Sequence, residues 1–288
     1  IRDSFEQGQL QEVIEHITCA FMSQKHISDH KERAQHAFDT HALLGSITIA
    51  TQGPAAAQTI DAYQDAARNS EQQNALQQCV ILWGKWLTQH SLAHFSSSKI
   101  AAEQLQKTAI MANSDFWLGW SYYALAQYYF YTGDTEACER LLIHSITLLN
   151  DAEMDVNPAL EFHGLRSYAL AYGLLGLTQA MLGRLNSGVQ NIQQALLLAE
   201  KSNNTAAKMA CRLYQLRLHY LTGNYRQLLE DSTILASFFK GQDQQSVWYQ
   251  IIQINTLLAQ QLLTPSLEPI QAMLTIRTTI EQNMPSIL

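Results

Sequence analysis

The sequence predicts an all-α fold, a right-handed solenoid of about six helical hairpins. Three observations lead to this expectation. A glycine-marked turn returns about every forty to fifty residues, at Gly53, Gly133, Gly183 and Gly223. Stretches with the apolar spacing of helices flank each turn, and no stretch shows the period-two alternation of a strand. Because one hairpin is too small to bury its own apolar stripe, neighbouring hairpins must stack.

Apolar periodicity and turn residues place the individual helices along the chain. We expect helices at residues 5–23, 31–51, 55–68, 73–94, 99–112, 115–132, 135–149, 159–182, 186–201, 205–221, 224–239, 245–262 and 266–283. The four glycine turns divide four hairpins, and weaker turns near 96–98 and 264–265 divide two more. The side chains of Asp134 and Asn224 are suited to cap the helices that follow them. The longest interruption, residues 150–157, predicts a longer loop.

Composition bounds the class of protein. The 288 residues are 47% hydrophobic and only 15% charged, which excludes a disordered chain. The net charge of −7, without a cluster of Lys and Arg, argues against nucleic-acid binding. No apolar run reaches the roughly eighteen residues of a membrane span, and no signal peptide opens the chain. We expect one elongated domain over residues 1–288, and the missing initiator methionine indicates a piece of a larger protein.

Four cysteines are spread along the chain without a C-x-x-C pair or a dense framework. They are Cys19, Cys79, Cys138 and Cys211. This spacing predicts small, reduced core residues and, with them, a cytoplasmic protein without disulfides or zinc.

The pair of helices around Gly133 has the clearest pattern. Large and small residues alternate around the turn in a fixed order, which comprises Tyr122, Leu125, Ala126, Tyr129, Cys138, Leu142 and Ser145. This order resembles the tetratricopeptide repeat, in which small residues let two helices cross closely. Around Gly183 the matching small positions are Gly176 and Gly188, and a mid-helix glycine requires such a packing reason. We therefore expect Gly176→Val to weaken folding.

Several further segments resemble the helical-repeat region of large bacterial signalling proteins that carry a regulatory ATPase. The segments are Leu43-Leu44-Gly45, Leu82-Trp83-Gly84-Lys85-Trp86, Tyr128 to Asp134, and Tyr168 to Tyr172. In that family the ATPase is fused to a nucleotide cyclase, a protein kinase or a DNA-binding output module. The resemblance implies that this chain is the repeat arm, that it receives a signal, and that any catalytic module lies elsewhere.

Signatures of catalysis and of cofactor binding are missing from the sequence. We find no phosphate-binding glycine loop, no H-E-x-x-H and no nucleophile elbow, so we expect neither an enzyme nor a cofactor. His26 and His30, and likewise His90 and His94, have the four-residue spacing of metal ligands on a helix. A solvated connection and a helix end explain these two pairs better, so we expect no metal site.

Aromatic residues concentrate in two neighbouring repeats and predict a binding surface. By the register fixed on Gly133, one side of helix 115–132 faces the concave groove of the stack, and residues of two other helices line the same groove. The candidate binding residues are Gln78, Lys85, Trp120, Tyr123, Gln127, Phe130 and Arg217. Aromatic side chains with an arginine and amides are the composition of binding hot spots. We expect Trp120→Ala to weaken binding and to leave folding nearly intact.

Three function classes stay open. The first is an arm that binds a protein, a peptide or a neighbouring domain of the same polypeptide on its concave face. The second is a small-molecule sensor like the repeat domain of maltose-type transcription activators, which requires a closed pocket. The third is a helical-toroid enzyme with clustered acids and histidines, against which the few charged residues of the inner faces count. We favour the first.

Overall fold

The computed structural model describes residues 10–68, 74–151, 168–202, 205–238 and 247–283. Within them the chain forms α-helices and one short 3₁₀ helix, η1 (Gln24–His26), and no strand. The α-helices are α2 (Leu10–Ser23), α3 (His30–Gln52), α4 (Ala57–Arg68), α5 (Ala75–Ser91), α6 (Phe95–Met111), α7 (Asp115–Thr132), α8 (Thr135–Asp151), α10 (Ala169–Met181), α11 (Leu185–Lys201), α12 (Thr205–Leu221), α13 (Tyr225–Ser237), α14 (Val247–Leu263) and α15 (Leu267–Asn283). The all-α prediction is confirmed.

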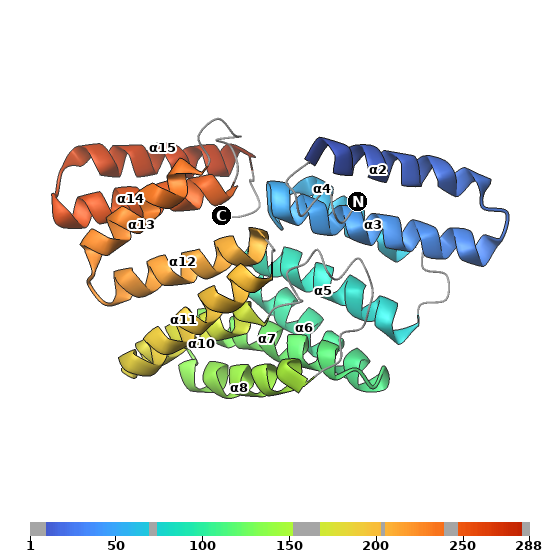
Figure 1. Ribbon diagram of the computed structural model, residues 1–288, viewed down its shortest axis with the longest axis horizontal. Coiled ribbons are helices and arrows are strands. Elements are labelled where there is room, and N and C mark those ends of the chain that lie inside the picture. The colour runs from blue at the N-terminus through green and yellow to red at the C-terminus, as the bar shows by residue number, and fades with distance from the viewer. Residues whose placement is uncertain (1–9, 69–73, 152–167, 203–204, 239–246, 284–288) are drawn as a thin grey trace.

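The helices pair into hairpins, and the hairpins stack in chain order. In each step the second helix of one hairpin packs on the first helix of the next: α4 on α5, α6 on α7, α8 on α10, α11 on α12, and α13 on α14. The stack bends into an arch, with α8 at the bottom of the view and the first and last hairpins both at its upper edge (Figure 1). This is a tetratricopeptide-like α-solenoid, as the sequence predicts.

The glycine turns form as predicted, and two turns use other residues. Gly53, Gly133, Gly183 and Gly223 all have positive φ, which a residue with a side chain rarely adopts. Ala93 and Asn113 have positive φ values of 57° and 51° and make the turns after α5 and α6. The turn that we expected at 96–98 is therefore wrong, because α5 ends at Ser91 and those residues belong to the first turn of α6.

Helix starts agree only in part with the expected caps. The backbone N–H of Ala137 donates to the Asp134 carboxylate at 3.0 Å, so that cap is confirmed. Asn224 stands at the N-cap of α13, but its side chain makes no capping hydrogen bond. The expected loop at 150–157 and the expected helix start at 159 lie largely outside the described residues.

Glycines inside the helices mark the closest contacts of the stack. A Cβ on Gly176 would lie 2.7 Å from the carbonyl oxygen of Gly188, so α10 and α11 cross almost backbone to backbone. The Tyr63 ring of α4 lies between Gly45 of α3 and Gly84 of α5, and a Cβ on Gly84 would come within 2.3 Å of the ring. The close helix crossing that we expected at Gly176 and Gly188 is therefore present.

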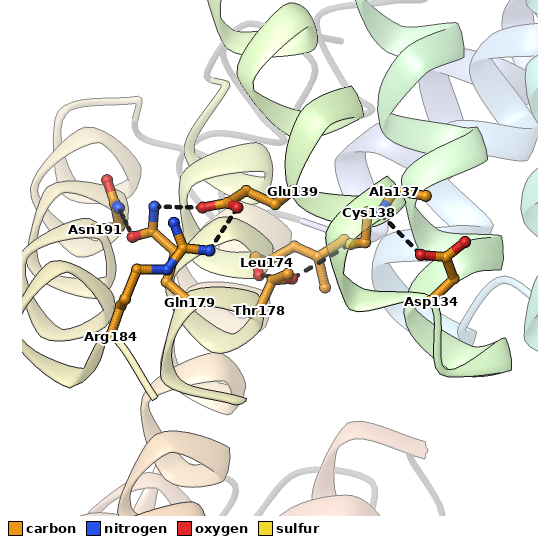
Figure 2. A network of polar contacts seen from close by, with 9 residues as sticks. All are labelled: Asp134, Ala137, Cys138, Glu139, Leu174, Thr178, Gln179, Arg184 and Asn191. Atoms are coloured by element: carbon orange, nitrogen blue, oxygen red, sulfur yellow. Dashed lines mark hydrogen bonds and ion pairs between the residues drawn. The ribbon is translucent and has the colours of Figure 1, made fainter. Parts of the chain in front are cut away.

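A polar network ties α8 to the following hairpin (Figure 2). Gln179 of α10 donates to the Glu139 carboxylate at 3.1 Å, and Arg184 pairs with the same carboxylate. Asn191 of α11 donates to the Gln179 side-chain oxygen at 2.7 Å. Burial alone would raise the pKa of Glu139, but the hydrogen bonds from Arg184 and Gln179 and the charge of Arg184 outweigh it and lower the pKa. Each polar group in this contact therefore has a partner.

Three of the four cysteines behave as expected. Cys79, Cys138 and Cys211 are buried, and burial raises the pKa of Cys138 to about 11 and that of Cys211 to about 12, which leaves these thiols protonated and unreactive. Cys19 is exposed on α2, so its assignment to the core is wrong. Within the described ranges no helix is long and apolar enough for a membrane span.

Candidate functional site

The predicted groove residues of α7 are buried. Trp120 is 0% exposed, Tyr123 4% and Gln127 8%. Their placement on an open groove is therefore wrong. Phe130 is half-buried against the core, and Gln78 on α5 is also half-buried. Of the seven candidates, only Lys85 and Arg217 are exposed to solvent.

Side chains from α5 and α12 fill the space that the groove would occupy. The Trp83 ring of α5 lies 5.4 Å from the Trp120 ring, and the Trp86 ring lies 6.0 Å from the Tyr123 ring. From α12, the Tyr214 hydroxyl lies 3.1 Å from the Tyr123 hydroxyl. Trp120 and Tyr123 therefore face the side chains of neighbouring helices and not an open groove.

Gln127 joins the two tyrosine hydroxyls into one buried unit. Its side-chain nitrogen donates to the Tyr123 oxygen at 2.6 Å and to the Tyr214 oxygen at 3.4 Å. Burial is the main reason that the pKa of Tyr214 rises to about 12 and that of Tyr123 rises well above its usual value. Both phenols therefore stay neutral, and the unit fixes α12 against α7.

Next to this unit, four side chains form what we call the rim: His90 of α5, Phe95 of α6, Tyr131 of α7 and Arg217 of α12. Arg217 donates to the Tyr131 hydroxyl at 3.3 Å. The Tyr131 ring stacks on Phe95 at 5.4 Å and meets the His90 ring edge-on at 5.1 Å. Tyr131 is 44% exposed, so the rim opens to solvent. It brings four helices together around one exposed cation.

His90 is the titratable group of the rim. Its ring stacks on Trp86 at 5.4 Å, and its Nδ1 atom is buried without a hydrogen-bond partner. Burial, and secondarily the charge of Arg217, lowers the pKa of His90 from 6.5 to about 4. His90 is therefore neutral at pH 7 and adds no second positive charge beside Arg217.

The His90 pKa predicts how stability depends on pH. In the unfolded chain His90 takes up a proton below about pH 6.5, whereas in the folded protein it does so only near the lowered pKa. Its contribution to stability is therefore complete above pH 6.5 and is lost as the pH falls toward 4. We expect His90→Phe, which keeps an aromatic ring, to lose less stability than the wild type between pH 7 and pH 4.5. Urea unfolding at both pH values measures this difference, and equal losses would contradict it.

Four buried tryptophans of α5 and α7 have indole N–H groups that donate no hydrogen bond. The indole nitrogens of Trp83, Trp86, Trp117 and Trp120 are buried and have no hydrogen-bond partner. A buried polar group without a partner costs free energy, so such a group merits an explanation. Three of these residues, Trp83, Trp86 and Trp120, lie in the interior between α5 and α7.

Sequence reasoning missed most of the rim. Of its four residues it selected only Arg217, and it considered His90 as a metal ligand or, preferably, as a residue of a helix end. A signal for Tyr131 existed, because Tyr123, Gln127 and Tyr131 follow one another at four-residue intervals on one side of α7. Trp86 and His90 have the same spacing on α5. The part played by Tyr214 has no such local signal, because it depends on how far the arch closes.

The histidine pairs do not assemble metal sites. His90 packs among aromatic rings, while the His94 Nδ1 atom is hydrogen-bonded with Gln89 at 3.1 Å. In the part of the chain that the structure describes, no group of three or more His, Cys, Asp or Glu side chains is placed to hold a metal ion.

Comparison with known proteins supports the fold and gives no family. No family model matches the chain, and no curated protein matches it in sequence. Among solved structures the chain is similar to the crystal structure of the apo form of RapI, with a TM-score of 0.54 and 11% sequence identity. The match covers 98% of this chain and 96% of the RapI chain. At this identity the likeness concerns the helical-repeat fold alone.

Proposed function

We propose that this chain is a non-catalytic recognition arm that binds a protein or peptide partner at the rim. The observation that carries the proposal is the Arg217–Tyr131 pair, an exposed cation and an exposed aromatic ring held together on the inner side of the arch. Arginine and tyrosine are enriched among residues that dominate binding energy at interfaces. The all-helical repeat architecture, which presents extended surfaces for contact, supports this class of function.

The rim suits recognition because its geometry is fixed before a partner arrives. The buried Tyr123, Gln127 and Tyr214 unit joins α7 to α12, so Tyr131 and Arg217 cannot drift apart without breaking it. A partner then loses little free energy to ordering of the surface, which favours affinity.

The wider setting follows from the sequence resemblance. We infer that the chain spans residues 1–288 as one repeat domain, works in the cytoplasm, and serves as the sensing arm of a bacterial signalling or transcription-regulatory protein. Its ATPase and its cyclase, kinase or DNA-binding output module would belong to other segments of that protein, and its partner is either a separate protein or one of those modules. The arm itself uses no cofactor and contacts neither nucleic acid nor membrane.

Peptide selection on the purified chain tests the recognition function. We expect a displayed library of random twelve-residue peptides to yield binders, and we expect Tyr131→Ala to weaken them at least tenfold. Ile143→Ala is the matched control, because Ile143 is similarly exposed but lies on α8. Failure to enrich any binder, or equal loss of binding in the two variants, would count against the function.

One observation favours a small-molecule sensor as a second candidate. The indole donors of Trp83, Trp86 and Trp120 are buried in the core without a partner, and the acceptor group of a small ligand that entered between α5 and α7 would satisfy them. A metabolite panel assayed by thermal unfolding tests this idea. A ligand that raises the melting temperature and shifts the indole N–H resonances of these tryptophans would favour the sensor over the peptide-binding arm.

A further inference from the structure

The Arg217 side chain forms no ion pair with an Asp or Glu carboxylate in the described residues. Within the described residues Arg68, Arg184 and Arg212 each pair with a carboxylate, whereas Arg226 on α13 has no ion pair and no aromatic neighbour of the kind found at the rim. Arg217 forms no such ion pair, and its one hydrogen bond goes to the Tyr131 hydroxyl. An arginine guanidinium carries five N–H donors in a planar fork, so most of its donors remain for another molecule.

The groups around Arg217 are neutral. Desolvation lowers the pKa of Arg217, but the interactions with the Tyr131, Tyr214 and Tyr123 hydroxyls outweigh it and raise the pKa, so the guanidinium keeps its charge. His90, the imidazole of the rim, is neutral at pH 7. In a chain with a net charge of −7, Arg217 thus holds a positive charge without an ion pair to a carboxylate in the part that the structure describes.

The position of Arg217 strengthens its attraction for an anion. Arg217 is exposed to solvent, yet the protein around it desolvates the guanidinium, as expected for a residue in a concave surface. Charge interactions are stronger where the surroundings exclude part of the water. The stacked Phe95 and Tyr131 rings stand at one side, where they would shield the contact and pack on an apolar neighbour of the anionic group.

We propose that Arg217, Tyr131 and Phe95 form a subsite for a carboxylate group of the bound peptide. This inference rests on the proposed function and names the chemistry that the rim recognises. The guanidinium fork donates two parallel hydrogen bonds to the carboxylate, which is the geometry that arginine offers and lysine does not. The Tyr131 hydroxyl holds the guanidinium in place, and its ring, with Phe95, contacts the side chain next to the carboxylate.

The carboxylate has two sources in a peptide, an acidic side chain and the free C-terminus. The probes are the peptides selected by display on this chain, synthesised in three forms. The first form keeps every carboxylate, the second replaces Asp and Glu by Asn and Gln, and the third has an amidated C-terminus.

Fluorescence anisotropy of labelled peptides measures binding to the wild type, to Arg217→Gln and to Arg226→Gln. Arg226 is an exposed arginine on α13 and serves as the matched control.

We expect removal of one carboxylate to weaken binding at least tenfold, and the form that loses affinity identifies the source. Arg217→Gln should bind the peptide with all carboxylates more weakly than the wild type by a similar factor. Its affinity should not change further when that carboxylate is removed, since the two groups act as a pair. Arg226→Gln should bind as the wild type does. Arg217→Lys should recover only part of the affinity.

Two results would overturn the subsite. One is equal affinity of the wild type for all three peptide forms. The other is binding by Arg217→Gln that still depends on the carboxylate. In both cases peptides bind, so the recognition function survives while the subsite fails. If Arg217→Gln melts at a lower temperature than the wild type, Tyr131→Phe replaces it, because this variant removes only the hydroxyl that positions the guanidinium.

Discussion

Gly176→Val should be among the most destabilising single substitutions in this chain. The first added carbon would lie 2.7 Å from the Gly188 carbonyl oxygen and 2.8 Å from the Ile192 side chain. Side chains can rotate away from an intruding atom, but a helix backbone moves only if α10 and α11 separate along their length. Overpacking of a tight core commonly costs about 1 to 3 kcal/mol, and a backbone contact should place this variant at or above the upper end.

Urea unfolding of Gly176→Val against the wild type measures this loss. Gly183→Asn is the control, because Gly183 also lacks a side chain but has nothing within 4 Å of its would-be Cβ, and asparagine tolerates its positive φ. We expect a loss below about 1 kcal/mol for the control. Comparable losses in the two variants would show that the helix crossing tolerates separation.

Trp120→Ala should also cost much of the folding free energy. Trp120 is fully buried and contacts the rings of Trp83, Phe116 and Tyr123. Replacing a buried tryptophan with alanine removes about 3 to 5 kcal/mol through lost burial and the cavity that remains. This expectation reverses the one drawn from sequence, in which Trp120 stood on an open groove and its loss left folding intact.

Thermal and urea unfolding of Trp120→Ala, with Met111→Ala for comparison, check this expectation. Met111 is a large apolar residue at the end of α6 that is 70% exposed, so its truncation should change stability by less than about 0.5 kcal/mol. Should the two variants unfold alike, Trp120 would not be the core residue that the structure makes it.

Much of the architecture could be predicted because it is local. Gly133 marks a turn by its own conformational freedom, and the small residues Ala126 and Cys138 mark close packing by their size; both are fully buried. Where the turn residue was ordinary, as at Ala93, prediction failed, because alanine gives no sign that it will adopt a positive φ.

The candidate site was harder to predict because it depends on the curvature of the whole arch. The repeat register placed Tyr123 and Gln127 on the groove side of α7, and in the structure both side chains contact Tyr214 of α12. Whether these side chains contact water or Tyr214 depends on the angles at which successive helices cross between α7 and α12. Small changes in each angle add up along the stack, and no local sequence pattern gives their total. Arg217 could be chosen by its chemistry alone, whereas its neighbour Tyr131 required the folded structure.

The hydrogen bond between Tyr123 and Tyr214 also bears on how the chain loses its structure. It joins α7 to α12 past the intervening α10 and α11, whereas repeat proteins usually unfold in pieces because each unit touches only its neighbours. A hydrogen bond between hairpins that are not neighbours in the stack couples the unfolding of the helices that it joins. Hydrogen exchange should therefore find α7, α10 and α12 opening together as one cooperative block, with the outermost helices fraying earlier.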